Sequence, residues 1–210
     1  MNWNKIAFTA VAVWGLTCGA FGQTLKVNGK AIETSSAVLK ETQGGKTVSL
    51  SDYKGENGTL VIFSCNTCPF VVGREGGFAG WEKDYNNITL LAKAKGYGVV
   101  LVNSNEALRK DVDSAEEMIK HAKAQKYIAP YIIDENHKLA DLLQAKTTPH
   151  VYLFNADYEL IYSGAIDNGT DPRRENVESY LVDALNANGG EIKVNETKAV
   201  GCSIKRVDKK

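Results

Sequence analysis

The feature that most constrains this chain is a pair of cysteines placed directly after a short apolar segment. Residues Leu60–Phe63 are all apolar and include β-branched and aromatic side chains, and such a run predicts a buried β-strand. Cys65 and Cys68 follow Ser64, and Pro69 then opens a second apolar stretch. A strand that brings Cys-x-x-Cys to the start of a helix is typical of a redox site.

The position of the two cysteines predicts different roles for them. Backbone N–H groups and the dipole at a helix N-terminus stabilise a thiolate, which is the reactive form of cysteine. We expect Cys65 to be the exposed nucleophile, and Cys68, one turn further on, to be shielded and close enough to form a disulfide with it. A purely structural disulfide at this spacing would close a very small loop and stabilise the fold little, so a redox role is favoured.

The composition is that of an ordinary globular protein without a surplus of charge. The chain has 210 residues, of which 24% are charged, and its formal net charge is +0. Nucleic acids and anionic membrane surfaces attract strongly basic proteins, so neither is an expected partner. The length suits one domain with a proper hydrophobic core.

The first 22 residues have the pattern of a secretory signal peptide. Lys5 supplies a positive charge, residues 6–16 form an apolar segment, and residues 20–22 place small side chains where signal peptidase reads them. We expect cleavage after Gly22 and export to the periplasm or out of the cell, with an uncleaved membrane anchor as the alternative. Cleavage would also remove Cys18.

Three cysteines would remain in the exported chain, at positions 65, 68 and 202. An odd number of cysteines cannot pair completely within one chain. Cys202 could resolve a sulfenic acid on Cys65 or Cys68, as a peroxidase requires, or it could be an inert packed thiol in the tail.

The apolar segments predict an alternating α/β architecture. Further buried strands are expected at residues 99–102 and 131–133, with amphipathic helices between them, and residues 151–162 read as an antiparallel hairpin. A turn at Gly44-Gly45 predicts a smaller hairpin before the first buried strand. The expected fold is a mixed sheet with helices on both faces, because βαβ units give parallel strands and hairpins add antiparallel edges.

Two predicted helices carry start signals. Asp113 and Glu116 have the spacing of a capping box at the start of one helix. Asp171 followed by Pro172 predicts the start of the last helix, whose apolar face would include Val177.

The chain resembles proteins of the thioredoxin fold. The resemblance rests on Cys65-Asn66-Thr67-Cys68-Pro69 at a strand end and on Thr148-Pro149 before another strand. In that fold a proline, cis in the family, faces the dithiol from such a strand start, and Pro149 matches it. The resemblance implies a groove shaped by Thr148 and Pro149, in which the backbone of Thr148 is free to pair with a bound peptide. It covers about residues 37–188 of one domain spanning 23–210, and residues 189–210 would form a tail.

Within that fold the chain is most similar to the redoxin branch, which includes peroxiredoxin-like proteins and periplasmic thiol reductases. Residues 45–55 resemble the hairpin before the active strand, and residues 201–205, Gly-Cys-Ser-Ile-Lys, resemble the tail of a peroxiredoxin-like subgroup. That subgroup commonly has histidine in place of Thr67 and aspartate in place of His150. Because histidine stabilises a neighbouring thiolate and threonine does not, we expect a less acidic Cys65 and a less oxidising disulfide here.

The predicted function is an exported thiol–disulfide oxidoreductase that reduces protein or small-molecule disulfides; running in reverse, the same pair would be an oxidase, and the reduction potential decides between the two directions. Cys65 would attack the substrate disulfide, Cys68 would release the product, and an upstream thiol reductant would regenerate the dithiol. This chemistry requires no metal or organic cofactor. One alternative is a thiol peroxidase, and another is a metal carrier with a Cys₃His ligand set: Cys65, Cys68, Cys202 and His150.

Overall fold

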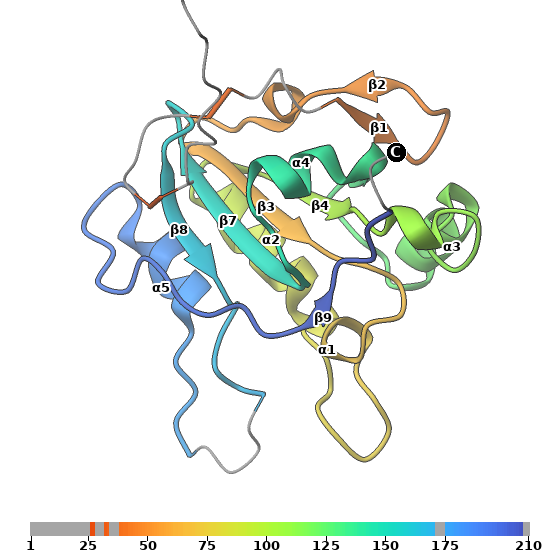
Figure 1. The fold of residues 1–210 in the computed structure, drawn as a ribbon. Coiled ribbons are helices and arrows are strands. Elements are labelled where there is room, and N and C mark those ends of the chain that lie inside the picture. Colours follow the sequence, from red (N-terminus) through yellow and green to blue (C-terminus); the bar gives the residue numbers. More distant parts are fainter. Residues whose placement is uncertain (1–25, 28–31, 34–37, 171–174, 208–210) are drawn as a thin grey trace, which may run out of the picture.

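The computed structural model describes residues 26–27, 32–33, 38–170 and 175–207 (Figure 1). The predicted signal peptide and Cys18 lie outside the described residues, as do Asp171 and Pro172. Within the described ranges, none of the helices has the length and apolar character needed to cross a bilayer.

A mixed β-sheet of seven strands forms the centre of the protein. Its strands are β1 (Leu39–Glu41), β2 (Thr47–Val48), β3 (Gly58–Phe63), β4 (Tyr97–Asn103), β5 (Tyr131–Asp134), β7 (His150–Asn155) and β8 (Leu160–Gly164). Their order across the sheet is β2-β1-β5-β4-β3-β7-β8. Strands β3, β4 and β5 are parallel, and the remaining neighbours are antiparallel. The predicted mixed sheet and both predicted hairpins are therefore confirmed.

The largely apolar character of β3 follows from its place in the sheet. β3 pairs along its whole length with β4 on one side and with β7 on the other, and all six of its residues are buried. A strand buried on both faces favours apolar side chains, and Thr59 is the one polar side chain of β3. The edge strand β8 instead alternates between buried and partly exposed residues.

Helices cover both faces of the sheet, as predicted. They are α1 (Pro69–Val72), α2 (Tyr85–Ala94), α3 (Ala115–Ala124), α4 (Lys138–Leu142) and α5 (Tyr180–Ala187). Residues of α2, α3 and α5 pack into one hydrophobic core, whereas α4 packs into a second core on the opposite face. Figure 1 shows α4 on one side of the sheet and α2 and α5 on the other.

Both predicted helix starts differ from the structure. The helix α3 is capped by Ser114, whose Oγ accepts a hydrogen bond from the Glu117 N–H at 3.3 Å, so the Asp113 capping box is wrong by one residue. The helix α5 begins only at Tyr180, and Val177 is 55% exposed rather than part of its apolar face.

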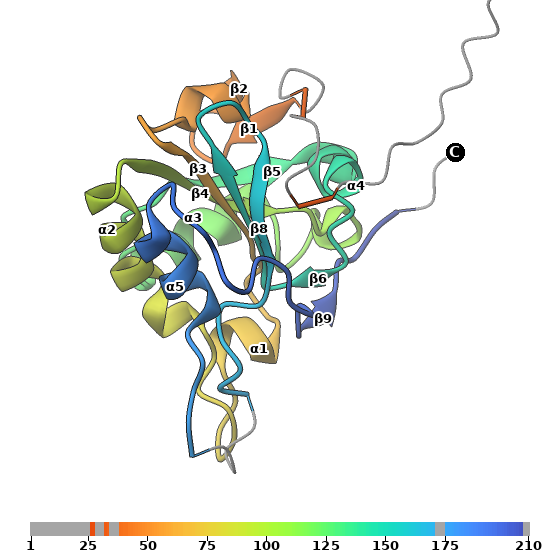
Figure 2. The ribbon, with the colours of Figure 1, turned by 90° about the vertical axis from the view of Figure 1, so that its left-hand side faces the viewer.

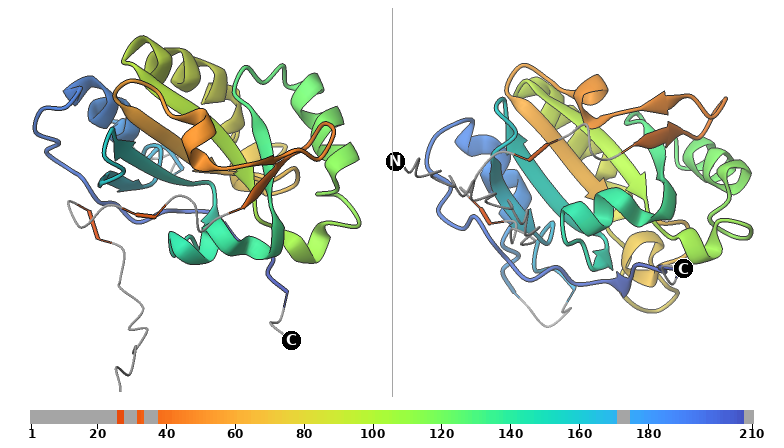
Figure 3. Two further views of the ribbon diagram at one scale, coloured as in Figure 1. Left: turned by 90° about the horizontal axis from the view of Figure 1, so that it is seen from above. Right: turned by 45° about the horizontal axis from the view of Figure 1, so that its top comes forward.

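The tail after α5 makes a second, two-stranded sheet. Its strand β9 (Cys202–Ser203) pairs antiparallel with β6 (Thr147–Thr148), and Figure 2 shows the two side by side near α1. The tail lies beside the edge strand β8 at one end, where Glu196 forms a bridge with Ser163. At its other end it reaches the turn at Glu106–Leu108, where the Ala107 N–H donates to the Lys205 carbonyl. Figure 3 shows this path along the lower edge of the sheet.

Candidate active site

The Cys-x-x-Cys motif lies where the sequence places it, at the carboxyl end of β3. The Ser64 N–H continues the pairing with β4 by donating to the Val102 carbonyl at 2.8 Å. Cys68 is the N-cap of α1, and its carbonyl accepts hydrogen bonds from the N–H groups of Val71 and Val72. Pro69 occupies the first helical position, where its missing N–H costs nothing. The short helix therefore begins at the second cysteine.

Thr148 and Pro149 face the two cysteines. The Thr148–Pro149 peptide bond is cis, as the resemblance predicts. The Thr148 Oγ1 lies 3.2 Å from the Cys65 Sγ, and the Cys68 thiol donates to the Thr148 carbonyl at 3.1 Å. All four predicted site residues thus meet in one place.

Both cysteines are buried, which differs from the expectation of an exposed nucleophile. Cys65 is 2% exposed and Cys68 is 4% exposed. They belong to the same hydrophobic core as β3 and α2, and the tail residues Val200 and Cys202 pack against that core. In this structure, therefore, a protein substrate has no direct access to either thiol.

The backbone of Thr148 is not free to bind a peptide, because the chain's own tail pairs with it. Thr148 is the register partner of Cys202, and the Lys146 carbonyl accepts a hydrogen bond from the Ile204 N–H at 3.0 Å. Gly201 makes this approach possible, since a Cβ there would lie 2.2 Å from the Thr148 carbonyl oxygen. The structure thus overturns the expectation of an open peptide edge.

The same pairing brings Cys202 to Cys68. The Cys202 N–H donates to the Cys68 Sγ at 3.4 Å, and the Cys202 thiol is close enough to shift the pKa of Cys68. All three cysteines of the described chain are free thiols. The site therefore holds three sulfur atoms, of which Cys68 contacts both others.

The interactions among these thiols shift the pKa values of Cys65 and Cys68 in opposite directions. The interaction with Cys65 lowers the pKa of Cys68 to about 5, and Cys202 and the Phe70 backbone add to this effect, while burial opposes it. The same shared proton, together with burial, raises the pKa of Cys65 above its ordinary value. With the tail in place, Cys68 is therefore the more acidic of the two thiols.

Comparisons with known proteins agree with this geometry. The redoxin family profile matches residues 26–181, which is most of the chain. This chain belongs to the redoxin family.

Solved structures show the same fold, which is thioredoxin-like. An uncharacterized conserved protein from Geobacillus kaustophilus is 28% identical, with a TM-score of 0.76 over 90% of this chain and 96% of its own. A hypothetical protein from Sinorhizobium meliloti is 26% identical, with a TM-score of 0.70 over 87% and 99%. The peroxidoxin BcpB from Mycobacterium tuberculosis is 12% identical, with a TM-score of 0.50 over 78% and 97%, and shares the fold. No curated protein matches the chain.

A buried carboxylate holds the Cys-x-x-Cys loop of this redoxin. The Asp113 Oδ1 accepts hydrogen bonds from the Asn66 N–H at 3.0 Å and from the Asn103 Nδ2 at 2.7 Å, and its Oδ2 accepts from the Asn105 Nδ2 at 2.8 Å. Asp113 is fully buried. The Asn105 Oδ1 in turn accepts from the Lys205 N–H at 2.8 Å, so one network joins the motif to the tail.

Sequence reasoning missed this role of Asp113 because its spacing to Glu116 fits a helix cap equally well. A signal was present nevertheless. Asn103 ends β4, which runs parallel to β3, and Asn105 follows two residues later. Polar side chains at the carboxyl ends of neighbouring parallel strands meet at one edge of the sheet.

The Cys₃His set of the metal-carrier hypothesis does not come together. His150 and Tyr152 lie on the face of β7 that belongs to the second core, whereas Cys65 and Cys68 belong to the first. Burial lowers the pKa of His150 to about 4, and its ring contacts the hydroxyls of Tyr152 and Ser163. Across the described part of the chain, no group of three or more His, Cys, Asp or Glu side chains is placed to hold a metal ion.

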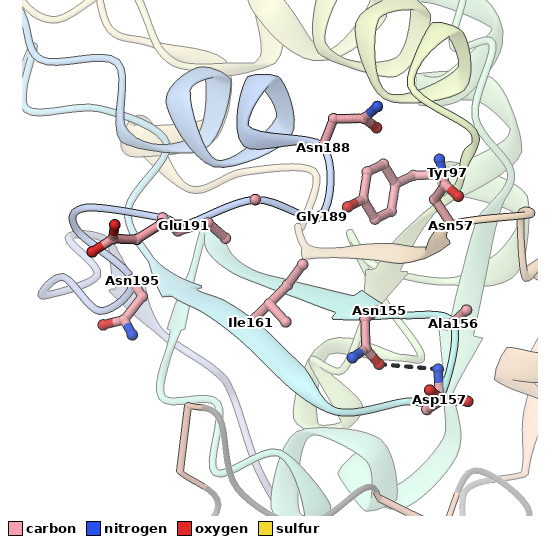
Figure 4. A pocket seen from close by; sticks show the side chains of 12 residues that line it. Asn57, Tyr97, Asn155, Ala156, Asp157, Ile161, Asn188, Gly189, Glu191 and Asn195 are labelled. Carbon is pink, nitrogen blue, oxygen red and sulfur yellow. Dashed lines mark hydrogen bonds between the residues drawn. The ribbon is translucent and has the colours of Figure 1, made fainter.

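The pocket in Figure 4 lies at the other end of β3 from the cysteines. Asn57, just before β3, and Tyr97, at the start of β4, line it, together with Asn155 at the end of β7. Asn57 is eight residues before Cys65, and a strand advances about 3.3 Å per residue, so the pocket is more than about 20 Å from the thiols. It is therefore separate from the redox site.

Proposed function

We propose that this redoxin is an exported thiol–disulfide oxidoreductase in which the Cys65–Cys68 dithiol reduces the disulfides of proteins or small molecules. The observation that carries the proposal is the meeting of both thiols with Thr148 and the cis Pro149 at the end of β3. The predicted signal peptide supports export to an oxidising compartment, where proteins with disulfides are common.

The reaction transfers two electrons from the dithiol to the substrate. The Cys65 thiolate attacks one sulfur of the substrate disulfide, and the electron pair of the broken bond leaves on the other sulfur. Cys68 then attacks the Cys65 Sγ of the mixed disulfide and releases the second substrate thiol. The product is a Cys65–Cys68 disulfide, which an external thiol reductant returns to the dithiol.

Substrate access requires the tail to leave β6. While β9 is paired, Thr148 has no free edge and the thiols are covered. Departure of β9 would open that edge to a peptide strand and remove the contacts of Cys202 with Cys68. The attacking Cys65 sulfur lies within hydrogen-bond distance of the Thr148 hydroxyl, which can donate to its thiolate.

Reduction of insulin by dithiothreitol, followed by turbidity, tests this function. We expect the wild-type protein to accelerate precipitation, and Cys65→Ser and Cys68→Ser each to fall to the rate of dithiothreitol alone. Ser203→Ala serves as the control, because that side chain is exposed and contacts neither thiol. Consumption of hydrogen peroxide in the absence of any insulin reduction would instead identify a thiol peroxidase and overturn the proposal.

A further inference from the structure

The tail lies on the site as a substrate peptide would. Its strand β9 runs antiparallel to the two residues before Pro149, in the register Thr147 to Ser203 and Thr148 to Cys202. An extended segment that adds to a free strand edge is a common mode of peptide binding. Cys202 therefore occupies the place of a cysteine within a bound peptide.

Contacts on both sides of β9 fix this placement. Gly201 lies directly on the Thr148–Pro149 peptide, where any side chain would collide with the backbone. Ile204 is 5% exposed in the second core. Beyond it, the Lys205 N–H donates to the Asn105 Oδ1 and the Lys205 carbonyl accepts from the Ala107 N–H at 2.9 Å. The position of Cys202 thus results from a built set of contacts rather than from a loose end of chain.

Within this site Cys202 contacts Cys68. Its amide nitrogen is 3.4 Å from the Cys68 Sγ, and its Cα is bonded to that nitrogen at about 1.46 Å, so the side chain starts within about 5 Å of the Cys68 sulfur. The two thiols lie close enough for each to shift the pKa of the other. Cys65 instead contacts Thr148 and Cys68 on the other side.

We propose that Cys202 is a third redox-active cysteine, which attacks Cys68 in the Cys65–Cys68 disulfide and converts it into a Cys68–Cys202 disulfide. The inference rests on the proposed function, because the disulfide that starts the exchange is the product of substrate reduction. It assigns the tail the role of an internal substrate strand for this same site.

The exchange conserves electrons. The Cys202 thiol loses its proton and its sulfur attacks the Cys68 Sγ, so that the Cys68–Cys202 bond forms and the Cys65–Cys68 bond breaks. The electron pair of the broken bond leaves on Cys65, where the Thr148 hydroxyl at 3.2 Å can donate to the new thiolate before it takes up the proton. One disulfide and one thiol are present before and after the step.

The pKa of Cys202 becomes more favourable for the exchange once Cys65 and Cys68 have formed their disulfide. Burial first, and then the contact with Cys68, raise the pKa of Cys202 to about 11 while Cys68 is reduced. When Cys68 enters a disulfide it no longer carries negative charge, so its contribution to that raised pKa disappears. Cys202 therefore becomes a better nucleophile at the moment when Cys68 becomes an electrophile.

The consequence is a covalently closed site with one free thiol. A Cys68–Cys202 disulfide would tie β9 to the start of α1, keep the Thr148 edge covered and leave Cys65 reduced. A reductant would then have to act on the tail disulfide before another substrate could bind.

Disulfide mapping of the oxidised full chain tests the inference. The wild-type protein is equilibrated with mixtures of reduced and oxidised glutathione, quenched with acid, alkylated, digested and analysed by mass spectrometry. We expect a peptide pair that links Cys68 to Cys202, with Cys65 alkylated. A Cys65–Cys68 disulfide with Cys202 fully alkylated at every glutathione ratio would overturn the exchange.

Single variants separate this inference from the proposed function. Cys65→Ser should still form the Cys68–Cys202 disulfide, and Cys68→Ser should form no Cys65–Cys202 disulfide. The double variant Cys202→Ser, Ser203→Cys is the matched control, since successive strand residues point to opposite faces and the moved thiol should not pair with Cys68. Equal pairing in that control would overturn the geometric claim.

Cys202→Ser tests the starting dithiol by itself. If this variant forms the Cys65–Cys68 disulfide but the wild-type protein never links Cys68 to Cys202, the dithiol function stands and the exchange falls. If the variant forms no Cys65–Cys68 disulfide, the proposed function falls, and the exchange that begins from that disulfide falls with it.

Discussion

Two strands bring cysteines to this site, and the protein holds them very differently. All six residues of β3 are buried and pair with a strand on each side. The two residues of β9 are partly or fully exposed and pair only with β6. β3, which ends two residues before Cys65, is thus part of the core, whereas the strand that carries Cys202 lies at the edge of the core.

The difference in free energy follows from the contacts. Burial of Ile204 stabilises the tail by about 1.5–3 kcal/mol and each of its hydrogen bonds by about 1 kcal/mol. Ordering each tail residue costs about 1–2 kcal/mol of conformational entropy, so the net free energy that keeps β9 paired with β6 is small. The comparison teaches that the site has two halves. The fixed half is β3 with the Cys65–Cys68 motif that follows it, and the mobile half is the tail around β9, which can separate from β6.

The largest expected effect is on the fixed half. Ile62→Ala in β3 should lower the free energy of unfolding by about 2–5 kcal/mol, because it leaves a cavity in a fully buried strand. Ile204→Ala should cost less, since the loss cannot exceed the free energy that holds the tail in place. Urea denaturation of both variants measures this, and equal losses would break the distinction between the two halves.

A smaller effect is expected on the acidity of Cys68. Gly201→Val should lift β9 from Thr148 and remove the Cys202 hydrogen bonds, so the pKa of Cys68 should rise from about 5 towards its ordinary value of 9.0. In the wild-type protein the thiolate forms as the pH rises through about 5; in the variant it should form at higher pH.

Absorbance of the thiolate at about 240 nm, followed against pH, measures this change. Ser203→Ala is the control, because its side chain is exposed and the pairing of β9 does not depend on it. An unchanged midpoint in Gly201→Val would show that the tail does not determine where the charge resides.

The fixed half is also the half that could be predicted from the sequence. The apolar run of β3 and the Cys-x-x-Cys spacing are local signals, the alternating segments predict the mixed sheet, and the resemblance to the thioredoxin fold implied the cis bond at Pro149. These signals are strong because a strand buried on both faces favours a continuous run of apolar residues.

The other half depends on contacts between distant parts of the chain. A two-residue strand such as β9 has no periodic pattern, so its pairing with β6 left no sign in the sequence. The contact between Cys202 and Cys68 results from that pairing. Asp113 was misread for a related reason, since its partners Asn66, Asn103 and Asn105 meet only in the folded protein.

Hydrogen exchange of the reduced wild-type protein tests the central claim most directly. We predict that amides in residues 202–205 exchange through local opening of the tail, many-fold faster than those of β3, which exchange only on global unfolding. Addition of a disulfide-containing peptide should increase exchange in the tail and leave β3 unchanged. Tail amides as strongly protected as those of β3, with and without the peptide, would contradict the account.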